Sequence, residues 1–121
     1  MVVTNYGKSQ IALVVGGSAG ITAPTYFIIG SGSGTALVTQ TALLAAIDRQ
    51  PVTSTDMSVT QKVKWTGDWT SSEISGTALT EFGMIISGGG LTGSLWSRSV
   101  IPAITFDGTN ELRIEENWQI Y

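Results

Sequence analysis

The sequence predicts an all-β fold: an antiparallel β-sandwich of jelly-roll or Ig-like type, with one or two short helices in the N-terminal half. Two observations carry this prediction. About six short segments, most of them after Pro51, read as strands separated by Gly- and Asp-rich turns. The chain also lacks the strand–helix alternation that is typical of a parallel sheet. Because the chain has 121 residues, which is a usual size for one domain, we expect a single domain over residues 1–121.

The first element is ambiguous between a strand and a helix. Apolar residues in 7–17 alternate as in a strand, but part of this segment also forms one helical face. Asn5 is a suitable helix cap, and the pair Gly16 and Gly17 is a suitable stop. The pattern therefore leaves both structures open for this segment.

The rest of the N-terminal half predicts a strand, a turn and a helix. Residues 25–29 are rich in β-forming types, and the Gly/Ser run at 30–34 predicts a turn or loop. Residues 39–49 ("TQTALLAAIDR") are the best helical candidate, because Ala and Leu favour a helix and Thr39 or Thr41 can cap it.

The second half of the chain predicts a series of strands with turns between them. Residues 59–65 alternate between two faces, and a further strand follows a turn at 75–76. Another alternating segment runs until Pro102, which we expect to interrupt the ladder. In these three segments, the residues expected to share a face are Val59, Gln61, Val63 and Trp65; Phe82, Met84 and Ile86; and Trp96, Arg98 and Val100.

Two connections and a closing strand complete the order of elements. The run "GGGLTG" at 88–93 predicts a linking loop, and "DGTN" at 107–110 predicts a turn whose Asp-Gly pair indicates a hairpin. Residues 111–121, "ELRIEENWQIY", predict the last strand. One face of that strand carries Leu112, Ile114, Glu116, Trp118 and Ile120.

Composition excludes several classes of function. The chain has no Cys and no His, so it lacks thiolate nucleophiles, disulfides and the commonest base and metal ligand. Its net charge is −3 with no basic run, so we expect no direct nucleic-acid binding. No apolar run approaches the ~20 residues of a membrane span, and the start lacks a basic signal region. We therefore expect a soluble protein without a cofactor, metal or membrane partner.

The low content of charged residues bears on assembly. Only 12% of residues are charged, against about 25% in typical soluble domains. A chain that buries much of its surface against neighbours has such a composition. An ordinary β domain rich in Thr, Ser and Gly has it too, and composition alone does not separate the two.

Two motifs that suggest catalysis fail in detail. A phosphate-binding loop needs Lys and Ser or Thr directly after its last Gly, but in 30–34 Gly34 is followed by Thr35 with no Lys nearby. Glycoside hydrolysis needs two carboxylates that flank one bond. Glu115 and Glu116 are adjacent, so in a strand they face opposite ways. We therefore expect no catalytic residue and no enzyme activity.

The four tryptophans are candidates for the core or for stacking on a sugar. Trp65, Trp96 and Trp118 share predicted strand faces with apolar neighbours, which favours the core. Trp69 lies in the polar stretch "GDWTSSE" and is the better candidate for an exposed contact.

The carboxylate of Glu116 is unexpected on an apolar strand face. Buried without a partner, it would cost several kcal/mol or stay protonated. Arg98 is a natural partner, because it also lies on a predicted apolar face, and breaking a buried pair costs ~3–5 kcal/mol. Two alternatives stand beside this pair. A bulge after Ile114 would turn Glu116 outward, and a subunit contact would bury it only on assembly.

Five stretches, in this order along the chain, form a further pattern: "PTYFIIGSGSG", "TALLAAIDR", "LTEFGMIIS", "GSLWSR" and "ITFDGTNELRIEENWQI". Together they resemble small virion structural proteins of tailed bacteriophages, of the tail-fibre and the neck or collar kind. The resemblance implies that Glu81 and Arg98 are structural positions. The closing strand departs from the common pattern at Glu116, where an apolar residue is more usual.

The resemblance implies a building block of a particle. We expect a neck/collar or tail component that assembles through subunit contacts, as a homo-oligomer and with other virion structural proteins. Its expected location is the virion, after assembly in the host cytoplasm. Two alternatives are a capsid decoration (cement) protein and a carbohydrate-binding module on a tail fibre, the latter binding a surface glycan.

Overall fold

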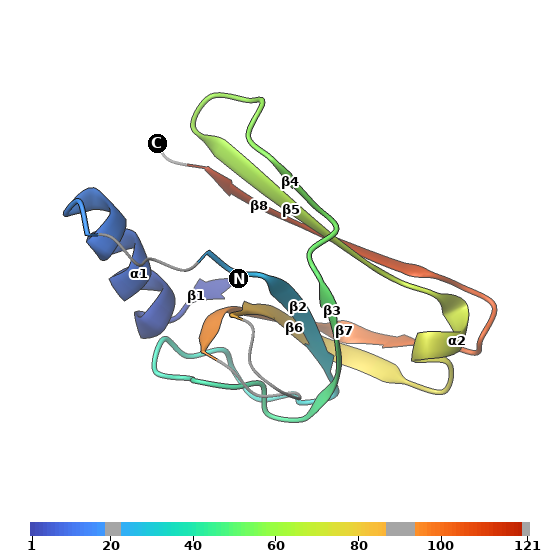
Figure 1. The fold of residues 1–121 in the computed structure, drawn as a ribbon. Coiled ribbons are helices and arrows are strands. Elements are labelled where there is room, and N and C mark those ends of the chain that lie inside the picture. Colours follow the sequence, from blue (N-terminus) through green and yellow to red (C-terminus); the bar gives the residue numbers. More distant parts are fainter. Residues whose placement is uncertain (19–22, 87–93, 120–121) are drawn as a thin grey trace.

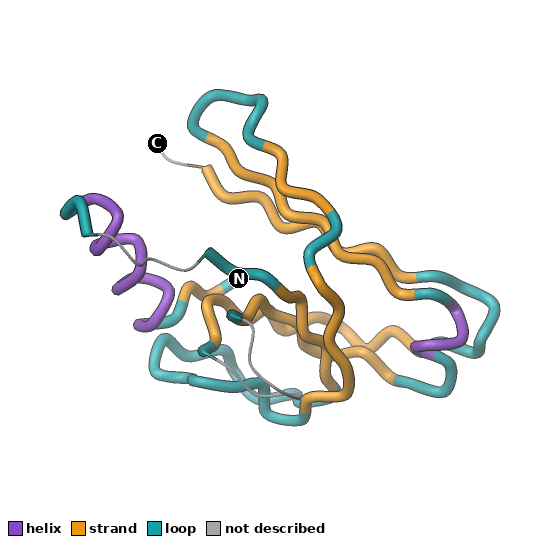
Figure 2. Tube along the Cα trace, viewed as in Figure 1, coloured by secondary structure: helices purple, strands orange, loops and turns teal. Residues whose placement is uncertain are grey.

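Two antiparallel sheets form a sandwich-like fold in the computed structural model, which describes residues 1–18, 23–86 and 94–119 (Figures 1 and 2). One sheet has five strands in the order β1-β7-β6-β2-β3, and the other has three in the order β4-β5-β8. This arrangement confirms the predicted all-β class. The strands are β1 (Val2–Val3), β2 (Tyr26–Gly30), β3 (Ala46–Pro51), β4 (Ser54–Asp56), β5 (Lys62–Trp69), β6 (Ala78–Ile85), β7 (Leu95–Thr105) and β8 (Leu112–Gln119); the helices are α1 (Asn5–Val15) and α2 (Ser71–Ile74).

The ambiguous N-terminal segment is helix α1. Its cap is Thr4 and not Asn5, because the Thr4 hydroxyl accepts the Gly7 N–H at 3.2 Å. The same hydroxyl donates to backbone carbonyls of β7, so the cap also ties the start of the helix to the sheet. As predicted, the helix ends at Gly16, and Gly17 takes a positive φ of 76°.

The helix predicted over 39–49 is wrong. Residues 31–45 form the irregular connection between β2 and β3, which we call the β2–β3 loop, and the strand β3 begins at Ala46. The helix propensity of a short Ala/Leu segment is outweighed here by pairing, since Ile28 of β2 lies opposite Arg49. The second helix, α2, lies in the second half of the chain, where none was expected.

The predicted strands are present with changed limits. The predicted strand at 25–29 is β2, whereas the strand expected from Val59 begins only at Lys62. β7 continues through Pro102, but its register with β6 shifts there. Val100 lies opposite Glu81 and Ile104 lies opposite Leu79, so β7 has more residues than β6 between these two pairs. The loop predicted at 88–93 and the position of Ile120 lie outside the described residues.

The Asp-Gly turn does not form a hairpin. Asp107 accepts the Thr109 N–H at 3.0 Å and Gly108 has a φ of 93°, so the turn itself is present. However, β7 pairs with β6 and β1, while β8 pairs with β5 in the other sheet. The chain therefore uses this turn to cross between the sheets.

The main core lies between the sheets, and a smaller one lies on the outer face of the five-stranded sheet. The sheets approach closely, since a Cβ on Gly67 of β5 would lie 2.4 Å from the Phe27 ring of β2. The main core includes Phe82, Met84 and Ile86, which share a face as predicted. The β2–β3 loop, at the bottom of Figure 1, covers the smaller core. That smaller core consists of Ile28, Leu43, Ile85 and Leu95.

A β-bulge at Trp96 breaks the alternation predicted for β7. The register moves from Met84 opposite Ser97 to Ile85 opposite Leu95, so Trp96 has no partner of its own. Trp96 packs in the main core, and the next side chain, Ser97, also reaches toward the three-stranded sheet. Arg98 then points to the outer face, and the prediction that it shares a face with Trp96 is wrong.

Candidate functional site

A buried ion pair lies on the outer face of the five-stranded sheet. Arg98 Nε donates to Glu81 Oε2 at 2.7 Å, and both side chains are fully buried. Glu81 also accepts the backbone N–H groups of Gly32 (3.0 Å), Leu44 (3.2 Å) and Ala45 (2.8 Å). Burial acts to raise the pKa of Glu81, but these bonds and Arg98 outweigh it and hold the pKa below its ordinary value. Glu81 is therefore a charged, fully bonded carboxylate.

This pair fastens the β2–β3 loop to the sheet. Arg98 Nη1 donates to the Gly34 carbonyl at 2.8 Å and to Gln40 Oε1 at 3.2 Å. A Cβ on Gly32 would lie 2.5 Å from Glu81 Oε1, so only glycine lets the loop backbone reach the carboxylate. The glycine run that resembles a phosphate-binding loop thus surrounds an internal anion.

Glu116 lies between the sheets, and the predicted pair with Arg98 is wrong. Its carboxylate is 5% exposed and accepts the Ser97 hydroxyl at 3.0 and 3.2 Å. No Lys or Arg of the described residues forms an ion pair with it. Burial raises the pKa of Glu116 to about 7, and the Ser97 hydroxyl and Trp118 indole offset only part of that rise. The Trp118 N–H nevertheless makes no hydrogen bond of ordinary geometry.

The other two explanations for Glu116 also fail. The bulge predicted after Ile114 is absent, because β8 pairs with β5 in unbroken register and Glu116 lies opposite Trp65. A subunit contact is unnecessary for burial, since the side chain is buried within the single chain. The bulge that matters is in β7, and it brings Ser97 to the carboxylate.

The tryptophans form an internal cluster. Trp65 and Trp96 are buried as predicted, and half-buried Trp118 lies 5.2 Å from the first ring and 5.6 Å from the second. Trp69 was expected to be exposed, but it is 1% exposed and its Nε1 donates to Asp48 at 3.0 Å. The platform for a sugar that Trp69 would supply is therefore absent.

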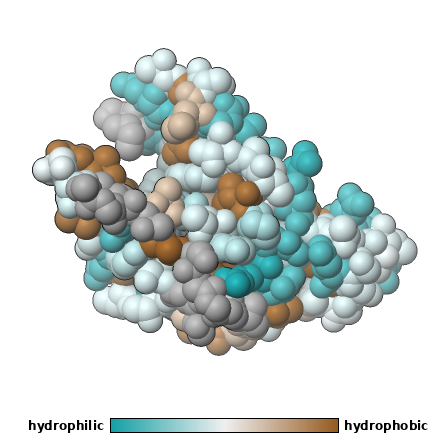
Figure 3. Space-filling view, in the orientation of Figure 1, coloured by the Kyte–Doolittle hydropathy of each residue, from teal (hydrophilic) through white to brown (hydrophobic). Residues whose placement is uncertain are grey.

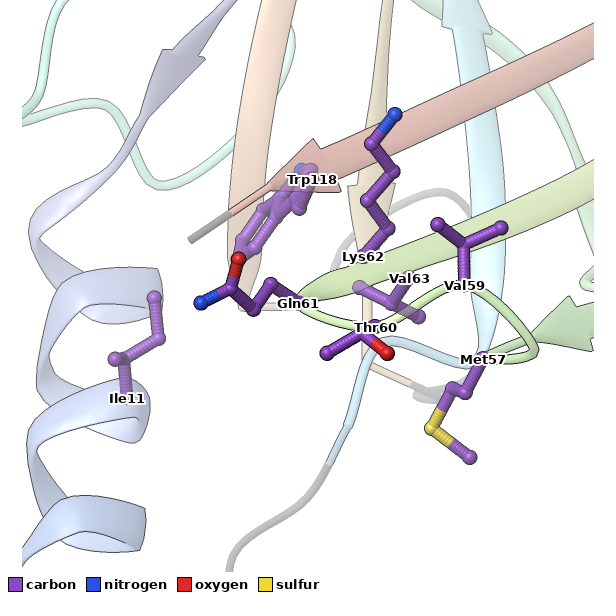
Figure 4. A pocket seen from close by; sticks show the side chains of 8 residues that line it. All are labelled: Ile11, Met57, Val59, Thr60, Gln61, Lys62, Val63 and Trp118. Carbon is purple, nitrogen blue, oxygen red and sulfur yellow. The ribbon is translucent and has the colours of Figure 1, made fainter. Parts of the chain in front are cut away.

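An apolar pocket of about 370 Å³ opens between α1 and the end of the three-stranded sheet. Figure 4 shows Ile11 of α1 facing the Trp118 ring and the segment that leads into β5. At its edge Met57 is 73% exposed and Val59 is 56% exposed. The lining has no carboxylate, so the pocket suits an apolar group and not hydrolysis by paired acids. It is formed by Ile11, Met57, Val59, Thr60, Gln61, Lys62, Val63 and Trp118.

Helix α1 extends this apolar region. Gly7 is its buried residue, and a Cβ there would lie 2.6 Å from the Trp96 carbonyl, so the first turn packs tightly on β7. The last turn does not, since Val14 is 56% exposed and Val15 is 84% exposed. Figure 3 shows apolar surface at the left of the molecule, where α1 lies in Figure 1. The last turn of α1 therefore presents apolar side chains to solvent.

Glu81 and Glu116 are each buried in separate internal contacts, so they do not form a catalytic pair. Across residues 1–18, 23–86 and 94–119, acidic side chains nowhere gather in threes as a metal site would require. No helix in those ranges has the length and hydropathy needed to cross a bilayer.

Sequence reasoning missed Ser97 and the donors around Glu81. A serine beside a bulge gives no signal in a one-dimensional pattern, because the bulge alone turns its side chain inward. The resemblance marked Glu81 and Arg98 as structural positions, but nothing in the sequence paired them. The amides of Gly32, Leu44 and Ala45 come from a segment for which a helix was expected.

Comparisons with protein-family models, with curated protein sequences and with solved structures find no match to this chain. The function of the chain is therefore inferred from its fold, from its exposed apolar surface and from the sequence resemblance.

Proposed function

We propose that the chain is a structural subunit of a tailed-phage virion, most simply a neck/collar or tail component. It works by stoichiometric contact with copies of itself and with other virion proteins, and not by catalysis. The observation that carries the proposal is the uncovered apolar region formed by α1 and the adjacent pocket. The sequence resemblance supplies the virion context.

The apolar region has the features of an assembly surface. Leu13, Val14 and Val15 are exposed together at the end of α1, and Met57 and Val59 are exposed at the pocket edge. Contiguous exposed apolar residues of this kind mark interaction sites in soluble proteins. The small number of charged side chains fits the same role, because charged residues are depleted at interface cores.

Two other roles use parts of the same surface. A capsid decoration protein would bind the shell through the α1 region. A carbohydrate-binding module would depend on Trp118, because this half-buried tryptophan lines the pocket whereas Trp69 is buried. Retention on a cell-surface polysaccharide that is lost in Trp118→Ala would favour the carbohydrate role over assembly.

The test compares Val15→Glu with Lys8→Glu, a matched change at an exposed polar position of the same helix. We expect the wild type and Lys8→Glu to form oligomers in sedimentation velocity experiments and Val15→Glu to shift toward monomer, with similar thermal stability in all three. Mass spectrometry of purified particles should detect the wild-type chain. A chain that stays monomeric at high concentration and is missing from particles would overturn the proposal.

A further inference from the structure

The four end strands of the two described sheets differ in how well they are protected against pairing. β1 has two residues and β4 has three, which is too short to template another strand. β3 ends at Pro51 and pairs with β2 through a register shift. β8 has eight residues, all paired with β5 without a shift. One end strand is therefore long and regular, and no other described strand pairs with its outer side.

Two of the usual protective devices, Pro and Lys, are missing from β8, although the strand has charged side chains and Glu116 faces inward. The solvent-facing side chains of β8 are Arg113, Glu115 and Asn117, so they carry charges of both signs, and Glu111 directly precedes the strand. Such an order can be complementary to itself when the strand is reversed.

We propose that β8 is the contact through which two copies of this chain associate. The two β8 strands pair antiparallel about a two-fold axis at Ile114 and join the three-stranded sheets of both copies into one. This inference rests on the proposed function, because it names the partner, a second copy, and the contact for one step of assembly. Main-chain hydrogen bonds provide the attraction, and side chains set the register.

The charge order favours this register over the two registers that differ from it by one step. Inward side chains must stay inward, so the pairing can slip only by two residues. With Ile114 opposite itself, Arg113 faces the partner's Glu115, and symmetry repeats this pair. Slipping by one step of two residues places Arg113 opposite Arg113 or Glu115 opposite Glu115, and like charges directly opposite are unfavourable.

Arg113 has donors free for this second carboxylate. Its Nε bonds to Asp68 Oδ1 of β5 at 2.6 Å, and its side chain is 65% exposed. A guanidinium has five N–H donors, so the contact with Asp68 leaves others for the partner's Glu115. Across the joined sheet, Arg113 would lie between two acids on neighbouring strands.

Disulfide cross-linking tests this register directly, because the chain has no cysteine of its own. Directly opposite Cα atoms in an antiparallel pair lie about 4.5–5.5 Å apart, within the range of a disulfide. We expect mixed Arg113→Cys and Glu115→Cys chains to form a disulfide heterodimer under oxidation, and neither variant alone to cross-link. A mixture of Ser54→Cys and Asp56→Cys, with the same spacing on the short edge strand β4, is the control and should give none.

The other outcomes overturn the inference. Cross-linking of Arg113→Cys alone or of Glu115→Cys alone would show a different register, and no cross-link would exclude the contact. If wild-type oligomers persist in sedimentation without the cross-link, only this inference fails and the proposed assembly role stands. As a second readout, Arg113→Glu or Glu115→Arg should each weaken dimerisation about tenfold, and the double exchange should restore it.

Discussion

Glu81 and Glu116 are both buried carboxylates on strands of one sandwich, but they lie on opposite faces of the five-stranded sheet. Glu81 has a guanidinium and three backbone amides as donors. Glu116 has the hydroxyl of Ser97. The pKa of Glu81 is lowered, and that of Glu116 is raised to about 7. Desolvation raises the pKa of both carboxylates, and only at Glu81 are there enough donors to outweigh it.

The two regions therefore respond to pH in opposite directions. Glu81 has a lowered pKa in the folded chain, so its stabilisation is present above the unfolded value and is lost as pH falls. Glu116 has a raised pKa, so the folded chain holds a proton that the unfolded chain releases between pH 4.5 and about 7. Its stabilisation is complete below that window and is lost as pH rises through it.

Removing the cation should break the Glu81 region with the largest effect. Arg98→Met leaves a buried carboxylate without its partner, so we expect the free energy of unfolding to fall by ~3–5 kcal/mol. Urea titration at pH 7 measures it. At a protein concentration that keeps the chain monomeric, Arg113→Met is the control, because its ion pair with Asp68 is exposed and its urea midpoint should stay close to that of the wild type. Equal effects of the two changes would contradict a structural role for the buried pair.

The pH profile tests the Glu116 region. A shift from 4.5 to about 7 corresponds to roughly 3 kcal/mol of stability that the wild type loses as pH rises through this window. Glu116→Gln has no proton to release, so its unfolding free energy relative to the wild type should increase by that amount between pH 4 and pH 8. At a protein concentration that keeps the chain monomeric, Glu115→Gln, on the opposite face of the same strand, should follow the wild-type profile. Parallel curves for all three proteins would refute the assignment.

Ser97→Ala removes the hydroxyl that donates to Glu116. A hydrogen bond to a charged group contributes about 1.5–3 kcal/mol, so Ser97→Ala should lose that much stability at pH 8 and less below pH 5. The change should also raise the pKa of Glu116 above about 7, because the bond favours the charged form. Ser99→Ala, two residues along β7, is the matched control. A loss of the same size at both pH values would mean that Ser97 acts only through packing.

The smallest predicted effect concerns the loop around Glu81. In Gly32→Ala, the new Cβ would lie 2.5 Å from both Glu81 Oε1 and Leu44 Cβ, so the loop must shift, at a cost of about 1–3 kcal/mol. The adjacent exposed Ser33→Ala should be neutral in the same urea titration. The pH dependence from Glu116 should persist in both variants. A neutral Gly32→Ala would show that the loop backbone is not held against the carboxylate.

The sequence predicted the parts of the fold that follow from local alternation. The β2 region and the apolar face of Phe82, Met84 and Ile86 were correct, because each depends on the two-residue period of a strand. The segment at 39–49 was wrong, since helix propensity in a short stretch yields to long-range pairing of β3 with β2. The Asp-Gly turn was found, but which strands it joins is decided by partners far away in the chain.

The buried acids could be noticed in the sequence but not assigned. Glu116 and Arg98 both stood out as charges on predicted apolar faces, and pairing them was the simplest interpretation. The bulge at Trp96 rules out that pair, because it turns Ser97 toward Glu116 and Arg98 toward the outer face of the sheet. Bulges of this kind arise from the fit between two strands, and a single strand's sequence does not contain that fit.

The cluster of Trp65, Trp96 and Trp118 has a consequence for spectroscopy. Its rings lie 5.2 and 5.6 Å apart, and one pair is nearly perpendicular at 86°. Because aromatic transitions at such separations couple, we expect the circular dichroism of this chain to contain an exciton signal in addition to that of its strands. Deconvolution that assumes backbone signal alone will misjudge the strand content. Trp96 belongs to β7 and Trp118 to β8, so the contribution of this one pair should report whether the two sheets are closed on each other, without any added label.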